Sequence, residues 1–208
     1  MTVPEGSKNS LESDTPPAPY ATDGTDFRGA VRYYHGVVLK KFLKVFPVFL
    51  ILWVQIFVTQ IGYLLPVAIV GMLGTVFTLF LLVDRLTLIR KCSKVFRTYP
   101  LEFRAPVEKY SMESTHTLFL RFGGQGGTPF TLRAKDALRG RWPVGITDGV
   151  WFAGDEPFGG AFIVPGGGEM LFLQPKDWNE AEKYRKDAGP ERVEKARRAG
   201  IRRPARLR

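Results

Sequence analysis

The chain has 208 residues, a formal net charge of +10 and a single cysteine, Cys92. One cysteine excludes an intramolecular disulfide and cannot build a cysteine-cluster metal site alone. The length leaves room for one small folded domain beside a membrane segment, and the charge must be located before it suggests a partner.

The basic excess lies outside the segment that we expect to fold as a domain. Residues 28–44 hold five Lys or Arg and no acidic residue, and residues 84–97 hold five against Asp84 alone. Residues 98–175 are close to neutral, whereas a nucleic-acid-binding domain carries positive charge on its own face. We therefore interpret the two basic segments, residues 28–44 and 84–97, as the flanks of a membrane segment between them, and we expect no nucleic-acid partner for the domain of residues 98–175.

The N-terminal part precedes any apolar run. Residues 1–27 are rich in Pro, Ser, Thr, Gly and acid, a composition typical of disorder. They lack the basic and apolar regions of a secretory signal. Residues 28–44 mix aromatic and aliphatic residues with basic ones, which predicts an interfacial helix that leads into the membrane.

The run from Val45 to Val83 contains no Asp, Glu, Lys, Arg or His. A helix rises ~1.5 Å per residue and a bilayer core is ~30 Å thick, so the run fits two crossings. Gly62 can end the first helix and Pro66 suits the first turn of the second. We predict a transmembrane hairpin with helices near residues 43–60 and 65–85, the second extending into the cytoplasm.

The orientation of this hairpin follows from its flanks. The short turn is uncharged and both outer flanks are basic, so the positive-inside rule places both termini in the cytoplasm. The protein is then a multi-pass protein of the cell membrane. Basic side chains beside a bilayer attract anionic headgroups at ~1 kcal/mol each. Those expected at the membrane surface are Lys40, Lys41, Lys44, Arg85, Arg90, Lys91 and Lys94.

Small and polar residues suggest how the two helices pack. In lipid, helices associate through close approach and polar contacts. We predict that Gln55 faces a small-residue stripe on the second helix and bonds a threonine hydroxyl or a carbonyl beside a glycine. The alternative is that Gln55 serves a second copy in a homo-oligomer. The residues assigned to this packing are Gln55, Thr59, Gly71, Gly74, Thr75 and Thr78.

From Tyr99 onward, apolar and polar residues alternate with period two, which predicts strands. Roughly six short strands with tight turns fit residues 98–175, and they lack intervening long helices. This pattern favours an antiparallel sheet curled into a small SH3-like or OB-like barrel in the cytoplasm. A pleckstrin-like roll is the alternative, because a helix follows the last strand.

That C-terminal helix has clear boundary signals. Asp177 can cap it, Glu180 completes a capping box, and Gly189 with Pro190 ends it. The basic residues beyond it predict a solvated or lipid-facing tail. The predicted units are 1–27, disordered; 28–97, the hairpin and its flanks; 98–188, the β domain with its helix; and 189–208, the tail.

Residue patterns for chemistry are weak. The glycine-rich run 123–127 lacks the Gly-Lys-Ser/Thr of a phosphate-binding loop and opens a strand. Nothing in the spacing supports His116 as a base with Asp148 or Asp155, and the acidic pair that starts at Asp155 lacks a third oxygen ligand. We expect no catalytic, cofactor or metal site. We interpret Cys92 as a small interfacial residue rather than an acylation site.

A tryptophan between the sheet strands is the best contact candidate. A Trp beside two Arg suits a protein partner or a headgroup, and it suits equally well a plug for the open end of a barrel. The residues concerned are Arg139, Arg141 and Trp142.

The order of these features resembles a known kind of protein. A polar N-terminus and a two-helix hairpin precede Tyr99-Pro-Leu-Glu-Phe-Arg, then Gly-Val-Trp-Phe-Ala-Gly-Asp, and a tail with Arg-Ala-Gly-Ile-Arg-Arg-Pro-Ala-Arg. This order is similar to that of small integral membrane proteins of unassigned function from actinobacteria. The resemblance implies no activity and no catalytic residues.

These features predict an integral membrane protein that presents a small β domain at the inner membrane surface, as an interaction or scaffold module with a protein partner. One alternative is an enzyme or small-molecule sensor with a pocket at the barrel mouth, near His116, Trp142 and Trp151. The other is a nucleic-acid or ribosome binder tethered to the membrane, acting through the basic tail.

Overall fold

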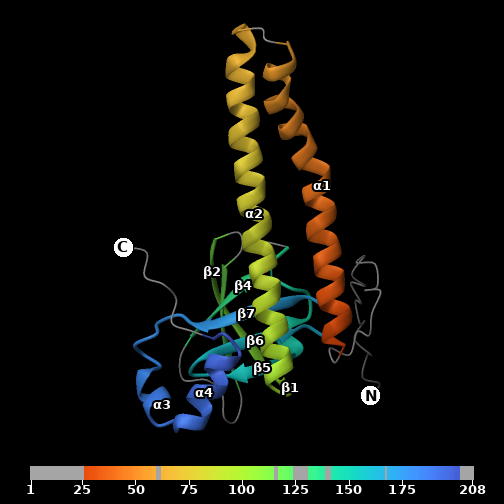
Figure 1. Ribbon diagram of the computed structural model, residues 1–208. Coiled ribbons are helices and arrows are strands. Elements are labelled where there is room, and N and C mark those ends of the chain that lie inside the picture. Colours follow the sequence, from red (N-terminus) through yellow and green to blue (C-terminus); the bar gives the residue numbers. More distant parts are fainter. Residues whose placement is uncertain are drawn as a thin grey trace, which may run out of the picture.

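The computed structural model describes residues 26–59, 62–114, 117–123, 131–138, 142–166 and 168–201. Two long apolar helices form an antiparallel hairpin, and a curled seven-stranded antiparallel sheet lies beside its lower half (Figure 1). Two short helices follow the sheet. The predicted order of an apolar helix pair, an antiparallel sheet and C-terminal helical structure is confirmed at this level.

The hairpin consists of α1 (Phe27–Thr59) and α2 (Leu65–Thr98), joined through a 3-10 turn at Gly62–Leu64. Asp26 caps α1, because its Oδ1 accepts a hydrogen bond of 2.9 Å from the Gly29 amide. The expected interfacial helix and first membrane helix are therefore one continuous helix, with Pro47 inside it. The second helix continues past the predicted membrane segment, which ends near residue 85, as far as Thr98 in the region of the sheet.

The sheet has the order β1-β5-β6-β7-β4-β3-β2, and every neighbouring pair is antiparallel. Its strands are β1 (Glu102–Arg104), β2 (Val107–Ser114), β3 (Thr117–Phe122), β4 (Leu132–Asp136), β5 (Val150–Asp155), β6 (Gly159–Ile163) and β7 (Met170–Pro175).

The two edge strands of this sheet, β1 and β2, are neighbours in the chain. Only Ala105 and Pro106 separate them, so the sheet must curl until its edges approach. The Gly123 amide after β3 donates to the Pro106 carbonyl at 2.9 Å, which continues the β2–β3 ladder by one step into the connection. The alternating segment that starts at Tyr99 is thus divided into β1 and β2, because Pro106 has no amide hydrogen for a ladder.

Both faces of the sheet are covered. The inner face of the curl gathers residues such as Leu120, Phe162 and Leu171 into one apolar cluster. The outer face presents Ile163 and Phe172 to a second cluster shared with the helices. Strand β6 is consequently buried at every position, which explains why its sequence is continuously apolar rather than alternating.

The C-terminal region differs from the prediction. The expected single helix is a turn followed by short α3 (Glu182–Lys186), and a second helix, α4 (Pro190–Arg198), comes after it. Pro190 starts α4 instead of ending structure, because proline suits the first turn of a helix. Ala196, Ala199 and Ile201 are buried in the cluster shared with α2. Residues up to 201 therefore belong to the fold, and the rest of the predicted tail lies outside the described residues.

Candidate functional site

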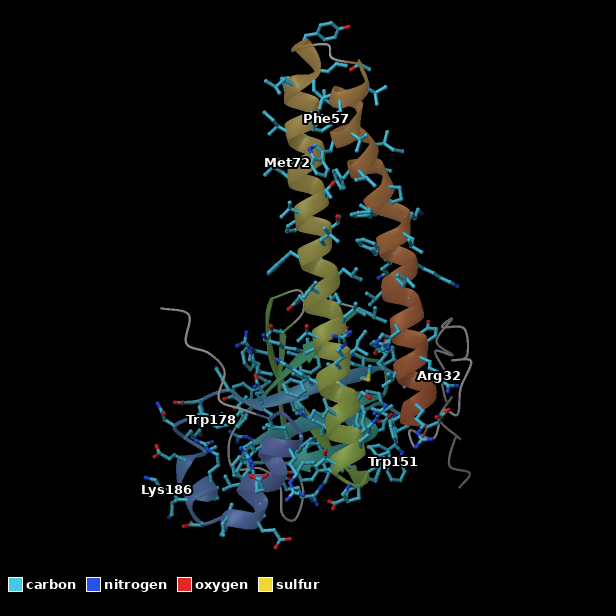
Figure 2. The ribbon with its side chains drawn as sticks, in the orientation of Figure 1. Arg32, Phe57, Met72, Trp151, Trp178 and Lys186 are labelled. Atoms are coloured by element: carbon cyan, nitrogen blue, oxygen red, sulfur yellow. The ribbon has the colours of Figure 1, made fainter. Side chains whose placement is uncertain are left out.

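The upper part of the hairpin is an apolar surface. Val58 and Phe80 are 77% and 67% exposed, and Figure 2 shows Phe57 and Met72 on this part, remote from Arg32 near the sheet. Both helices are long and apolar enough to cross a membrane. In the apolar 18-residue segment of each helix, the buried share is 0% for the first helix and 22% for the second. A core helix of a soluble protein would be covered by the rest of the chain. Exposed large apolar side chains gathered on two adjacent helices are unusual on monomeric soluble proteins.

The small-residue stripe of α2 lies against α1. A Cβ added to Gly71 would lie 2.7 Å from the Leu52 carbonyl carbon, and one added to Gly74 would overlap the Phe49 ring. The Thr75 and Thr78 hydroxyls donate to the carbonyls of Gly71 and Gly74, both at 2.8 Å. The glycines therefore permit close helix approach, and the threonines bond within their own helix.

The two threonine hydroxyls of the stripe donate to α2 carbonyls rather than to Gln55. The expected bond from Gln55 to a threonine hydroxyl or to a carbonyl beside a glycine stays a prediction. The α1 backbone at Leu52 and the Phe49 ring occupy the positions opposite the glycines. Gln55 is half-buried, and its backbone carbonyl accepts a hydrogen bond of 2.9 Å from the Thr59 hydroxyl. Its service to a second copy stays a prediction.

The lower halves of both helices pack on the outer face of the sheet. Tyr34 of α1 is buried, and its hydroxyl accepts a hydrogen bond of 2.9 Å from the Met170 amide at the start of β7. Ile89 and Cys92 of α2 enter the same cluster. Burial and the charge of Asp136 raise the pKa of the Cys92 thiol. The β domain therefore packs directly on the two helices and is not connected to them through a flexible linker alone.

Most of the basic residues assigned to the membrane surface are exposed, and Arg85 is half-buried. Its Nη1 donates to the carbonyls of Asp136 and Ala137, at 3.1 and 2.9 Å. It therefore fastens α2 to the end of β4. The exposed members are Lys40, Lys41, Lys44, Arg90, Lys91 and Lys94.

An apolar cavity of about 360 Å³ lies between the two helices at the end of the charge-free run. Lys41 of α1 and Arg85 of α2 both line it, so the two helices reach charge at the same level. Its apolar wall includes Val38, Phe42, Val45, Leu81, Leu82 and Leu138.

A second, polar cavity of about 200 Å³ lies on the sheet side of Arg85. Three further cations line it: Lys91, Arg133 and Lys135. Burial first, and then the neighbouring Arg133, lower the pKa of Lys135. The Arg133 Nε is buried without a hydrogen-bond partner among the described residues. This cavity concentrates positive charge where water is partly excluded.

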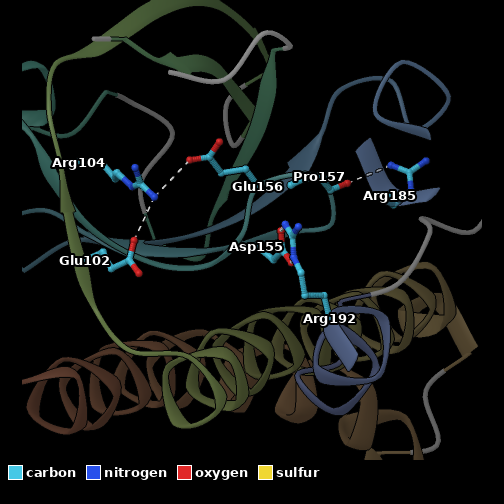
Figure 3. A network of polar contacts seen from close by, with 7 residues as sticks. All are labelled: Glu102, Arg104, Asp155, Glu156, Pro157, Arg185 and Arg192. Atoms are coloured by element: carbon cyan, nitrogen blue, oxygen red, sulfur yellow. Dashed lines mark hydrogen bonds and ion pairs between the residues drawn. The ribbon is translucent and has the colours of Figure 1, made fainter. Parts of the chain in front are cut away.

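A third cavity of about 510 Å³ lies between α4, the start of β1 and the β5–β6 turn. Asp155 bonds Arg192 at 2.7 and 2.9 Å, and Arg104 lies 3.0 Å from Glu102 and 3.7 Å from Glu156 (Figure 3). Burial raises the pKa of Glu156, against the opposing effect of Arg104. The network clamps α4 onto the turn.

Arg185 of α3 contacts the same β5–β6 turn, because its Nη1 donates to the Pro157 carbonyl at 3.0 Å (Figure 3). Among the described residues, no group of three or more His, Cys, Asp or Glu could hold a metal ion. The acids of this cavity are paired with arginines, which is an arrangement for docking an element rather than for proton transfer.

Trp142 of the predicted contact site packs partly buried against the inner cluster of the sheet, with the Lys109 Nζ 5.8 Å from its ring. This position agrees with a plug at the barrel end. Asp148 is exposed on a 3-10 turn at Ile146–Asp148. Arg139, Arg141 and His116 lie outside the described residues.

The chain matches no family model, no curated protein and no solved structure. Its resemblance to small actinobacterial membrane proteins therefore stays a prediction.

Proposed function

We propose that this protein crosses the cell membrane twice through residues 45–83, with both termini in the cytoplasm, and holds its β domain as an interaction module at the inner surface. The observation that carries the proposal is the shared boundary on the two helices. Exposed apolar side chains give way to Lys41 and Arg85 at one cavity. A bilayer surface is where such a change is favourable on both helices at once.

The length of the helices supports the same arrangement. At ~1.5 Å per residue, the 34 residues of α2 extend about 50 Å, well beyond a ~30 Å core. The remainder is the part that packs on β5, β6 and β7. The domain would thus keep a constant height and orientation above the headgroups, which suits a scaffold for a protein partner.

Reporter fusions test the topology. A reporter that is active only in the cytoplasm should be active after Ile201 and before Asp26, and inactive when placed in the turn at Gly62. The protein should also stay with membranes washed in alkaline carbonate. Activity outside the cell at either terminus, or release into the wash, would contradict the proposal.

Crosslinking in native membranes tests the interaction role. The full chain should capture a partner that the hairpin alone, residues 26–98, does not capture. The same captured set for both would show that the β domain contributes nothing.

The two alternatives have less support. Trp142 packs partly buried against the inner cluster of the sheet, which leaves less room beside it for a sensor's ligand. In the described part of the basic C-terminal region, Arg197 and Arg198 contact Glu194, at 2.8 and 3.4 Å. These contacts partly neutralise the charge that a nucleic-acid binder would use.

A further inference from the structure

The apolar cavity and the cationic cavity meet at one residue. Arg85 lines both, and the short segment Asp136–Ala137–Leu138 runs from the cationic cavity to the apolar one. The Arg85 guanidinium is held by the Asp136 and Ala137 carbonyls, so it is fixed as a shared wall. The two cavities thus adjoin on either side of Arg85, at the level where the apolar hairpin ends.

The apolar half suits a hydrocarbon chain. It lies between α1 and α2, beside the exposed apolar surface of the hairpin, and Phe42, Val45 and Leu82 line it. Its volume of about 360 Å³ falls within the range of ~300–1,000 Å³ that is usual for ligand pockets. A ligand that fills it must carry an apolar segment from the bilayer side.

The polar half suits a phosphate group. Lys91, Arg133 and Lys135 add three cations to Arg85, against Asp84 and Asp136. Asp136 already accepts the Leu138 amide at 2.9 Å, and it is buried. The buried Arg133 Nε has no hydrogen-bond acceptor among the described residues, which is a donor that an anionic oxygen would satisfy.

We propose that the two adjoining cavities bind one anionic phospholipid of the inner leaflet that extends past Arg85, with an acyl chain between α1 and α2 and the phosphate among Arg85, Arg133 and Lys135. This rests on the proposed membrane insertion of the hairpin. Bound in this way, the lipid joins the hairpin to β4 and β7, so lipid charge affects how firmly the domain is seated. A zwitterionic lipid carries a cation that this cavity repels.

The test uses the full chain, purified in mild detergent after exposure to equal amounts of phosphatidylglycerol and phosphatidylcholine. Lipid retained per protein is measured by mass spectrometry. We expect phosphatidylglycerol to exceed phosphatidylcholine by about tenfold, as two or more effective cations imply. Equal retention of the two lipids would overturn the proposal without any variant.

A matched pair of double variants locates the site. Arg133→Gln with Lys135→Gln should lower phosphatidylglycerol retention about tenfold. Arg32→Gln with Lys183→Gln removes the same charge from exposed positions that line neither cavity and are not among the residues assigned to the membrane surface, and it should change retention less than about twofold. Equal losses of retained phosphatidylglycerol in the two double variants would indicate a general electrostatic attraction to the lipid and would overturn the proposed site. Thermal unfolding in lipid-free detergent checks that each variant is folded.

Two further measurements test whether the acyl chain contributes to binding and whether free phosphate can replace the lipid. Val45→Trp fills the apolar half and should reduce phosphatidylglycerol retention while leaving the cations in place. Inorganic phosphate should stabilise the protein far less than phosphatidylglycerol, and equal stabilisation would overturn a lipid ligand. A protein released by carbonate would refute the membrane proposal itself, whereas one that stays in membranes but shows no lipid preference would refute only this site.

Discussion

Cys92 illustrates how a residue just beyond an apolar helix segment can be buried by tertiary packing. It is 2% exposed, in the cluster between α2 and the outer face of the sheet. Its thiol pKa is raised by burial, so little thiolate forms near neutral pH. A surface acylation site needs the opposite properties.

We expect Cys92 in the folded protein to react with a maleimide at least about a hundredfold more slowly than in the unfolded chain, because reaction requires local opening. Mass spectrometry of the adduct over time at pH 8 measures this. The variant Cys92→Ser with Lys94→Cys moves the thiol to an exposed position of the same helix and should react at once. Equal rates for the two would contradict the burial.

Tyr99 gives a pH dependence whose sign can be stated. Its hydroxyl is buried without a hydrogen-bond partner among the described residues, and burial raises the pKa of Tyr99 to about 12 from its usual 10.0. The unfolded chain loses the phenolic proton first. Stability from this group is therefore complete below about pH 10 and falls as pH rises toward 12.

Tyr99→Phe should flatten this alkaline loss, and at neutral pH it should leave stability unchanged or raise it by up to about 1 kcal/mol, since an unpaired buried hydroxyl is removed. Unfolding in detergent at several pH values between 8 and 11 checks this. Tyr110→Phe, at a residue that is 65% exposed, is the control and should retain the wild-type slope. Parallel slopes for all three proteins would contradict the assignment.

At the scale of the elements, the helix contact depends on missing side chains. A Cβ at Gly71 would press on the α1 backbone at Leu52, which cannot rotate away. Gly36 on α1 is a matched control, because nothing lies within 4 Å of a Cβ there.

Gly71→Ala should destabilise the hairpin by about 1–3 kcal/mol through overpacking. Gly36→Ala should be neutral or stabilising by up to about 1 kcal/mol, because alanine loses less backbone entropy in a helix. Unfolding by denaturing detergent measures both. A stabilising effect at Gly71 would mean that the helices lie farther apart than described.

The C-terminal region forms two short helices, α3 and α4, where the local sequence signals predicted one. The Gly189-Pro190 signal marks a chain reversal, and the same Pro can end one helix or start another. What selects α4 is its docking: Arg192 bonds Asp155, a carboxylate only 8% exposed, from the β5–β6 turn. That partner is distant in sequence, so no local pattern could have indicated it.

At the scale of the whole molecule, the sheet and the hairpin share one core. The outer face of β6 and β7 is covered only while α1 and α2 are in place, and the hydrogen bond from Met170 to Tyr34 crosses the same interface. The β domain is thus not an independent soluble unit.

We expect the fragment of residues 98–201 to aggregate, because Ile163 and Phe172 would face water. Ile163→Lys with Phe172→Lys should restore its solubility, and the same pair should destabilise the full chain by several kcal/mol through buried charge. Light scattering of the fragment and unfolding of the full chain measure these effects. A soluble, monomeric wild-type fragment would contradict the shared core.

The helix pair, the turn near Gly62, the antiparallel strands and the basic flanks could be predicted from the amino-acid sequence, because they depend on composition and on periodicity within one segment. The fold was needed to show that the edge strands β1 and β2 meet at Pro106, that α4 belongs to the folded unit, and that Phe49 and Leu52 lie against the glycines. It also brought Arg85, Arg133 and Lys135 to one cavity. Such contacts join residues far apart in the chain, and their free energy depends on how whole faces fit together, which no local pattern records.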